Sequence, residues 1–121
     1  MKLIYIIAPY SAKTDAKRSS NIHDAKQLAL YCWTKGYAVL CPHLNSAWMS
    51  GIVPEEQFYL GTLKMLSRCD IAICVPHVEA STGSLAELAY ANEKTIPVIN
   101  LTKEEYRSIL NDVKHYLENL K

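Results

Sequence analysis

The feature that most constrains the fold is an alternation of short apolar runs with longer amphipathic segments. Four runs are apolar and largely β-branched: residues 3–7, 37–41, 71–75 and 96–99. Runs of this length without polar alternation are typical of strands buried on both faces. Strands that alternate with helices pair in parallel through right-handed crossovers. We therefore expect an α/β fold, a three-layer sandwich with a Rossmann- or flavodoxin-like parallel sheet of four to five strands.

The segments between and after these runs predict four helices. Apolar residues recur at spacings of three and four after Asn21, a plausible N-cap, and Gly36 is suited to end that helix. Pro54, followed by two glutamates, predicts a second helix start. A third helix should follow the Ser-Thr-Gly-Ser sequence at 81–84, and residues 106–120 form a long amphipathic stretch. Residues 43–53 lack a period and predict a loop.

Length and charge exclude several classes of protein. The 121 residues suit a single domain, residues 1–121, and the formal net charge is only +1. A nearly neutral chain lacks the basic surface with which proteins bind a nucleic-acid polymer. No apolar run reaches the roughly 18 residues of a membrane span. The amino-terminal run stops at Pro9 without a small-residue cleavage site, so secretion is not expected.

The cysteines predict neither a metal site nor a disulfide framework. Cys32, Cys41, Cys69 and Cys74 contain no Cys-x-x-Cys pair. Most lie in apolar surroundings, where a free cysteine behaves as a small buried hydrophobe. We expect reduced thiols, a cytoplasmic location and no bound metal.

Ligand contacts are expected in four loops. In open parallel sheets, ligands bind beyond the carboxyl ends of the strands, at the point where the strand order reverses. The sequence places four segments there: residues 8–10, 42–43, 76–77 and 81–87.

The most informative of these loops is Ser81-Thr82-Gly83-Ser84-Leu85-Ala86-Glu87. A small, hydroxyl-containing loop that enters a helix offers unpaired N–H groups to an anion. Glu87 follows about one turn later, and the helix dipole should keep its carboxylate ionised at neutral pH. Two interpretations stay open from spacing alone. Glu87 is either a functional carboxylate or a solvated residue that complements the dipole, and Ser81 is either a ligand group or an ordinary cap.

Four motifs, in order, make the chain resemble the nucleoside 2-deoxyribosyltransferase-like family, including its branch of 2′-deoxynucleoside 5′-monophosphate N-glycosidases. The motifs are Ile4-Tyr5-Ile6-Ile7-Ala8-Pro9-Tyr10, Arg68-Cys69-Asp70-Ile71, Gly83-x-x-x-Glu87-Leu88-Ala89-Tyr90-Ala91 and Lys94-Thr95-Ile96-Pro97-Val98. Each is short, but the ordered set spans residues 3 to about 100.

The resemblance implies specific catalytic roles. Glu87 would be the nucleophile that attacks C1′ of the deoxyribose, and Tyr5 would orient its carboxylate. Asp70 would lie near the leaving base and help its departure. Two carboxyl groups with different roles are the usual solution for retaining glycoside cleavage. The resemblance implies no cofactor, and it implies a homodimer or higher homo-oligomer.

The resemblance also implies where the substrate binds. Ser81 stands six residues before Glu87, where the monophosphate branch also has a serine. Transferases that act on free nucleosides carry an aspartate at this position, and its carboxylate would repel a phosphate. Ser81, Gly83 and Ser84 are therefore candidate 5′-phosphate ligands. Tyr10 could stack on the base, and His43 could contact the base or the phosphate. The family's early loop is rich in glycine and arginine, whereas this chain offers Lys13, Lys17 or Arg18 as the cation.

The leading hypothesis is cleavage or exchange of the N-glycosidic bond of a deoxynucleoside or its 5′-monophosphate through a covalent glycosyl-glutamate intermediate. The alternative is a non-catalytic domain that binds a nucleotide derivative on the same fold. The expected partner is a small nucleoside or nucleotide, with neither a nucleic-acid polymer nor a membrane.

Overall fold

A computed structural model describes residues 1–49 and 51–120. A four-stranded parallel sheet has the order β2-β1-β3-β4. Its strands are β1 (Leu3–Ile7), β2 (Ala38–Leu40), β3 (Ile71–Cys74) and β4 (Val98–Asn100). The order confirms the expected parallel sheet, and four strands fall within the expected number.

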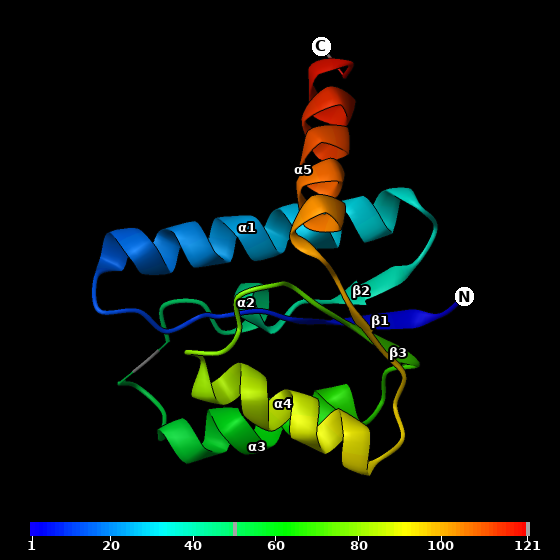
Figure 1. Ribbon diagram of the computed structural model, residues 1–121. Coiled ribbons are helices and arrows are strands. Elements are labelled where there is room, and N and C mark those ends of the chain that lie inside the picture. Colours follow the sequence, from blue (N-terminus) through cyan, green and yellow to red (C-terminus); the bar gives the residue numbers. More distant parts are fainter. Residues whose placement is uncertain (50, 121) are drawn as a thin grey trace.

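Helices cover both faces of this sheet and form the outer two layers (Figure 1). The helices are α1 (Asp15–Thr34), α2 (Pro42–Asn45), α3 (Glu55–Leu66), α4 (Thr82–Glu93) and α5 (Lys103–Glu118). Figure 1 shows α1 and α5 on one face and α3 and α4 on the other, with α5 projecting away from the sheet. The three-layer sandwich expected from the alternating pattern is therefore confirmed.

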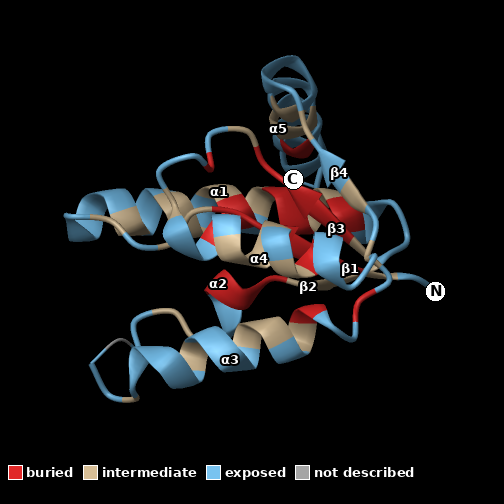
Figure 2. Ribbon diagram, turned by 60° about the horizontal axis from the view of Figure 1, so that its bottom comes forward, coloured by how far each residue is buried: buried red, intermediate tan, exposed pale blue. Residues whose placement is uncertain are grey.

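The core lies along the two inner strands. Residues 4–7 of β1 are at most 3% exposed, because β2 and β3 flank β1 and helices cover both of its faces. Figure 2 shows the buried residues concentrated on the sheet and on the inner side of α1. All four cysteines are buried and unpaired, as their apolar surroundings predicted. Within the two described ranges, no helix has the length and apolarity needed to cross a membrane.

Several boundaries differ from the expectations. Helix α1 begins at Asp15 with Thr14 as its N-cap, about two turns before Asn21. Asn21 instead lies within the helix, and its side-chain amide donates to the Tyr10 carbonyl at 3.1 Å. The predicted loop at 43–53 contains part of the short helix α2, and Ser50 lies outside the described residues. Gly36 does follow the end of α1, with a φ of +91° that glycine adopts at little cost.

The strand order fixes the position of the functional loops. Strands β1 and β3 are neighbours, and the chain continues from β1 to one side of the sheet and from β3 to the other. The carboxyl ends of these two strands therefore form the point at which the strand order reverses, where such folds bind ligands.

Candidate active site

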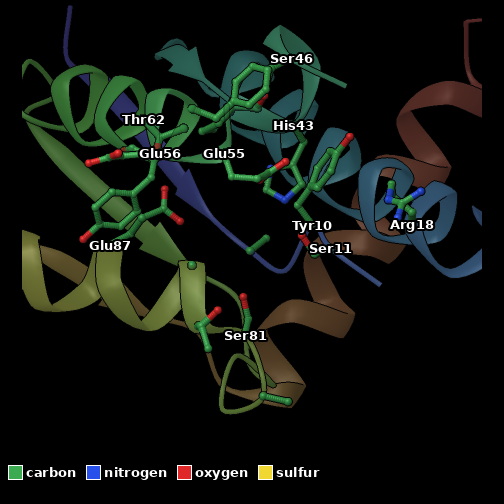
Figure 3. Close-up of a pocket in the computed structure, with 17 residues that line it drawn as sticks. Tyr10, Ser11, Arg18, His43, Ser46, Glu55, Glu56, Thr62, Ser81 and Glu87 are labelled. Atoms are coloured by element: carbon green, nitrogen blue, oxygen red, sulfur yellow. The ribbon is translucent and has the colours of Figure 1, made fainter. Parts of the chain in front are cut away.

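The carboxyl edge of the sheet holds a cavity of about 640 Å³, within the usual range for small-molecule sites. Three of the four predicted loops contribute to its wall, and α3 closes another side (Figure 3). Residues from these loops include Ala8, Tyr10, Pro42, His43, Ser81, Thr82, Gly83 and Glu87. The remaining predicted loop, at 76–77, lies outside this lining and contributes His77 to a neighbouring cavity.

Glu87 lines the cavity, and the buried Tyr5 lies behind it. Tyr5 is in the middle of β1 and fully buried, while Glu87 lies in the second turn of α4. The Tyr5 hydroxyl donates a hydrogen bond to Oε2 of Glu87. The structure thus brings together two of the three residues to which the resemblance gave catalytic roles.

Burial controls the protonation of this pair. It raises the pKa of Glu87 to about 7, and the hydrogen bond from Tyr5 acts in the opposite direction by favouring the charged form. Burial, followed by the neighbouring Glu87 charge, raises the pKa of Tyr5 and keeps its phenol protonated. This direction is opposite to the expectation that the helix dipole keeps Glu87 ionised at neutral pH, because burial favours the neutral carboxyl group.

Asp70 does not lie where the resemblance implied. It immediately precedes β3, so it is at the amino edge of the sheet, whereas the cavity opens at the carboxyl edge. Its carboxylate accepts a hydrogen bond from the Leu3 N–H at 2.7 Å, and its side chain is not part of the cavity wall. The expected position of Asp70 beside a leaving base is therefore wrong. The contact with Leu3 gives Asp70 a structural role at the start of two adjacent strands.

The start of α4 supplies one wall of the cavity. Ser81 is the N-cap, and its Oγ accepts from the Ser84 N–H at 3.2 Å and donates to Ser84 Oγ at 2.8 Å. Ser84 is 2% exposed and absent from the cavity wall, so it supports the cap and does not face a ligand. At Gly83, an added Cβ would meet no atom within 4 Å. The missing side chain therefore leaves open space beside the helix start.

Tyr10 and His43 form the opposite wall. Their ring centroids are 5.7 Å apart, and the planes are tilted by 56°. His43 Nε2 lies 3.0 Å from the Pro9 carbonyl oxygen, which can only accept, so this nitrogen carries the proton. Burial lowers the pKa of His43, which favours the neutral ring. The His43 ring can therefore support a ligand by packing, but it supplies no positive charge for a phosphate.

Helix α3 contributes residues that sequence reasoning missed. Glu55, Glu56 and Thr62 face the cavity from the side opposite Ser81 (Figure 3). The two glutamates had a sufficient explanation as acids at a helix start, and no spacing signal distinguishes a cavity-lining acid from a dipole-complementing one. Within residues 1–49 and 51–120, no three His, Cys, Asp or Glu side chains gather as metal ligands would.

Arg18 is the cation that reaches the main cavity. Its guanidinium donates to Asp15 at 2.7 Å and lies 5.4 Å from the centre of the Trp48 ring. Trp48 in turn donates its backbone N–H to the Tyr10 hydroxyl at 2.9 Å. These contacts link the loop after β1 to the loop after α2. The other two candidate cations, Lys13 and Lys17, line the neighbouring cavity instead.

A family model described as a domain of unknown function, DUF7768, matches residues 2–101. The chain belongs to the DUF7768 family. This DUF7768 match covers the whole sheet and α1 to α4, and α5 follows it. A search of curated proteins finds no match to this DUF7768 chain.

Three solved structures are similar to this DUF7768 protein in fold. The 2-deoxyribosyltransferase of Bacillus psychrosaccharolyticus superposes with a TM-score of 0.60 at 19% identity, over 81% of this chain and 70% of that one. The CMP N-glycosidase BcmB of Clostridium botulinum superposes with a TM-score of 0.61 at 15% identity, over 95% of this chain and 100% of that one. The solution structure of BlsM superposes with a TM-score of 0.64 at 15% identity, over 98% of this chain and 75% of that one. At these identities the likeness establishes the fold, which is the one the sequence resemblance implied.

Glu87 should make the stability of the fold depend on pH. Its pKa is about 7 when folded, against an ordinary value of 4.5, so the folded state holds its proton more tightly. This contribution is fully present below about pH 4.5 and is lost as pH rises through 7. Urea unfolding from pH 4.5 to 7.5 should show the wild type losing about 2–3 kcal/mol relative to Glu87→Gln.

The comparison with Glu87→Gln isolates the carboxyl group. His43 has a lowered pKa, so its own contribution grows with pH in this range, but it is common to both proteins. Parallel stability curves for the two proteins would show that Glu87 is not desolvated.

Proposed function

We propose that this protein cleaves or transfers the N-glycosidic bond of a deoxynucleoside or its 5′-monophosphate, with Glu87 as nucleophile. The observation that supports the proposal most strongly is the hydrogen bond from the buried Tyr5 to Glu87, whose carboxyl group lines the cavity. Two proteins of the same fold are named as a 2-deoxyribosyltransferase and a CMP N-glycosidase. The motifs that contain Tyr5 and Glu87 agree with that chemistry.

In the proposed reaction, ionised Glu87 attacks C1′ while the C1′–N bond breaks. The electron pair of that bond leaves with the base, which takes up a proton from the solvent, and the sugar becomes an ester of the Glu87 carboxylate. Water then attacks C1′, restores the carboxylate and completes hydrolysis; a second base in its place would complete transfer. The Tyr5 hydroxyl stabilises the charged carboxylate before attack and again as it leaves.

The substrate orientation follows from the walls of the cavity. With C1′ at Glu87, the base occupies the side formed by Tyr10, His43 and α3, where an aromatic ring offers stacking. The 5′-phosphate occupies the side formed by Ser81 and Gly83, at the positive end of α4. Arg18, also on the cavity wall, lies on the Tyr10 side, where it pairs with Asp15 and packs against Trp48. Ser84 is left out of this assignment because it is buried beneath the cap.

The first test measures base release. Purified protein incubated with each deoxynucleoside 5′-monophosphate should release free base, detected by chromatography. Glu87→Gln should reduce the rate about 10³-fold, since the reaction loses its nucleophile while the shape of the cavity is retained.

Asp70→Asn is the matched control, because it neutralises a carboxylate at the other edge of the sheet. This variant should retain nearly wild-type activity. If Asp70→Asn and Glu87→Gln lose activity equally, the assignment of Glu87 is wrong. If nucleotides bind but no base is released by the wild type, the non-catalytic binding domain is the better account.

A second test addresses the 5′-phosphate. Ser81→Asp keeps a good N-cap residue on α4 but places a negative charge where the phosphate should bind. The KM for a deoxynucleoside monophosphate should rise about tenfold, while the KM for the unphosphorylated deoxynucleoside should stay within about twofold. An equal rise for both substrates would place the phosphate elsewhere.

The expected homo-oligomer stays a prediction.

A further inference from the structure

A second cavity, of about 470 Å³, adjoins the candidate active site. The two cavities share wall residues Ala8, Ser11, Ala80 and Ser81. Ser81 is the residue that the proposed function assigns to the 5′-phosphate, so the second cavity begins where a mononucleotide would end. The proposed chemistry at Glu87 leaves this second space without an occupant.

The walls of the second cavity favour an anion. Lys13 and Lys17 line it against a single acid, Asp24, so the charged groups sum to +1 with histidine neutral. Thr14, the N-cap of α1, also lies in this wall, so the positive end of that helix borders the cavity in addition to the positive end of α4. Both lysines are exposed, and neither forms a salt bridge in the described chain.

The walls also offer neutral and acidic hydrogen-bonding groups. Asp24 and Tyr106 both line the cavity, the latter from α5. Burial and the nearby Asp24 charge raise the pKa of Tyr106 to about 12, so its hydroxyl stays neutral. A carboxylate and a neutral phenol are suited to bind the hydroxyl groups of a sugar.

We propose that the substrate is extended on its 5′ side: a nucleoside diphosphate, with a hydroxyl-bearing group such as a sugar on the distal phosphate. This inference rests on the proposed function, because the reaction at C1′ sets which end of the ligand reaches Ser81. The first phosphate binds at Ser81 and Gly83. The second phosphate lies between Lys13 and Lys17, and the attached group extends toward Asp24 and Tyr106.

Isothermal titration calorimetry tests this arrangement. Glu87→Gln serves as the reference protein, so that ligands are not consumed. The probes are a deoxynucleoside monophosphate, the corresponding diphosphate and a nucleoside diphosphate-linked sugar. The diphosphate should bind about tenfold more tightly than the monophosphate, because two further charge pairs form. The linked sugar should bind at least as tightly as the diphosphate.

The matched variants remove two positive charges each. Lys13→Ala with Lys17→Ala should weaken binding of the diphosphate much more than binding of the monophosphate, and so abolish the preference for the diphosphate. Lys26→Ala with Lys114→Ala is the control, since both lysines are exposed and outside either cavity. The control pair should retain the preference.

Equal affinity for monophosphate and diphosphate would overturn the inference, as would equal losses in the two double variants. Base release from the monophosphate by the wild type tests the proposed function separately. If that release occurs without a diphosphate preference, only the extended substrate is refuted. If no nucleotide binds, both proposals fail.

Discussion

The hydrogen bond from Tyr5 to Glu87 joins the centre of the sheet to the wall of the cavity. Tyr5 is fixed by strand pairing on both sides of β1, so its hydroxyl has little freedom to move. Glu87 is brought to it by α4, which follows β3 and packs with α3 on one face of the sheet. One buried contact thus sets the position of the carboxylate, and the surrounding burial that raises its pKa to about 7 poises it between its charged and neutral forms.

Much of the architecture was predictable because it depends on short-range patterns. Apolar runs such as 71–75 mark buried parallel strands, and the alternation with helices then leaves few topologies. The rule that ligands bind at the carboxyl edge indicates four loops, and the family resemblance then singles out Tyr10, His43, Ser81, Gly83 and Glu87 within them. These five residues all line the observed cavity.

The failures have physical causes that a single sequence conceals. Asp70 stands at the start of a strand, and a motif match does not say that its carboxylate is engaged by the Leu3 N–H at the opposite edge. The ionisation of Glu87 was misjudged because a helix dipole can be read from sequence, whereas desolvation depends on the packing of distant segments. The roles of Glu55, Glu56 and Lys13 depend on how α3 and the loop after β1 are placed, which no local spacing specifies.

The proposed reaction forms a bond between Glu87 and C1′, and mass spectrometry of a trapped intermediate tests that bond most directly. A substrate with fluorine at C2′ of the sugar slows hydrolysis of a glycosyl-enzyme ester and allows it to accumulate. We predict a mass increase equal to the fluorinated sugar phosphate less one water, located by peptide mapping on Glu87 and absent from Glu87→Gln. An unmodified protein that still releases base from this substrate, or a label on another residue, would contradict it.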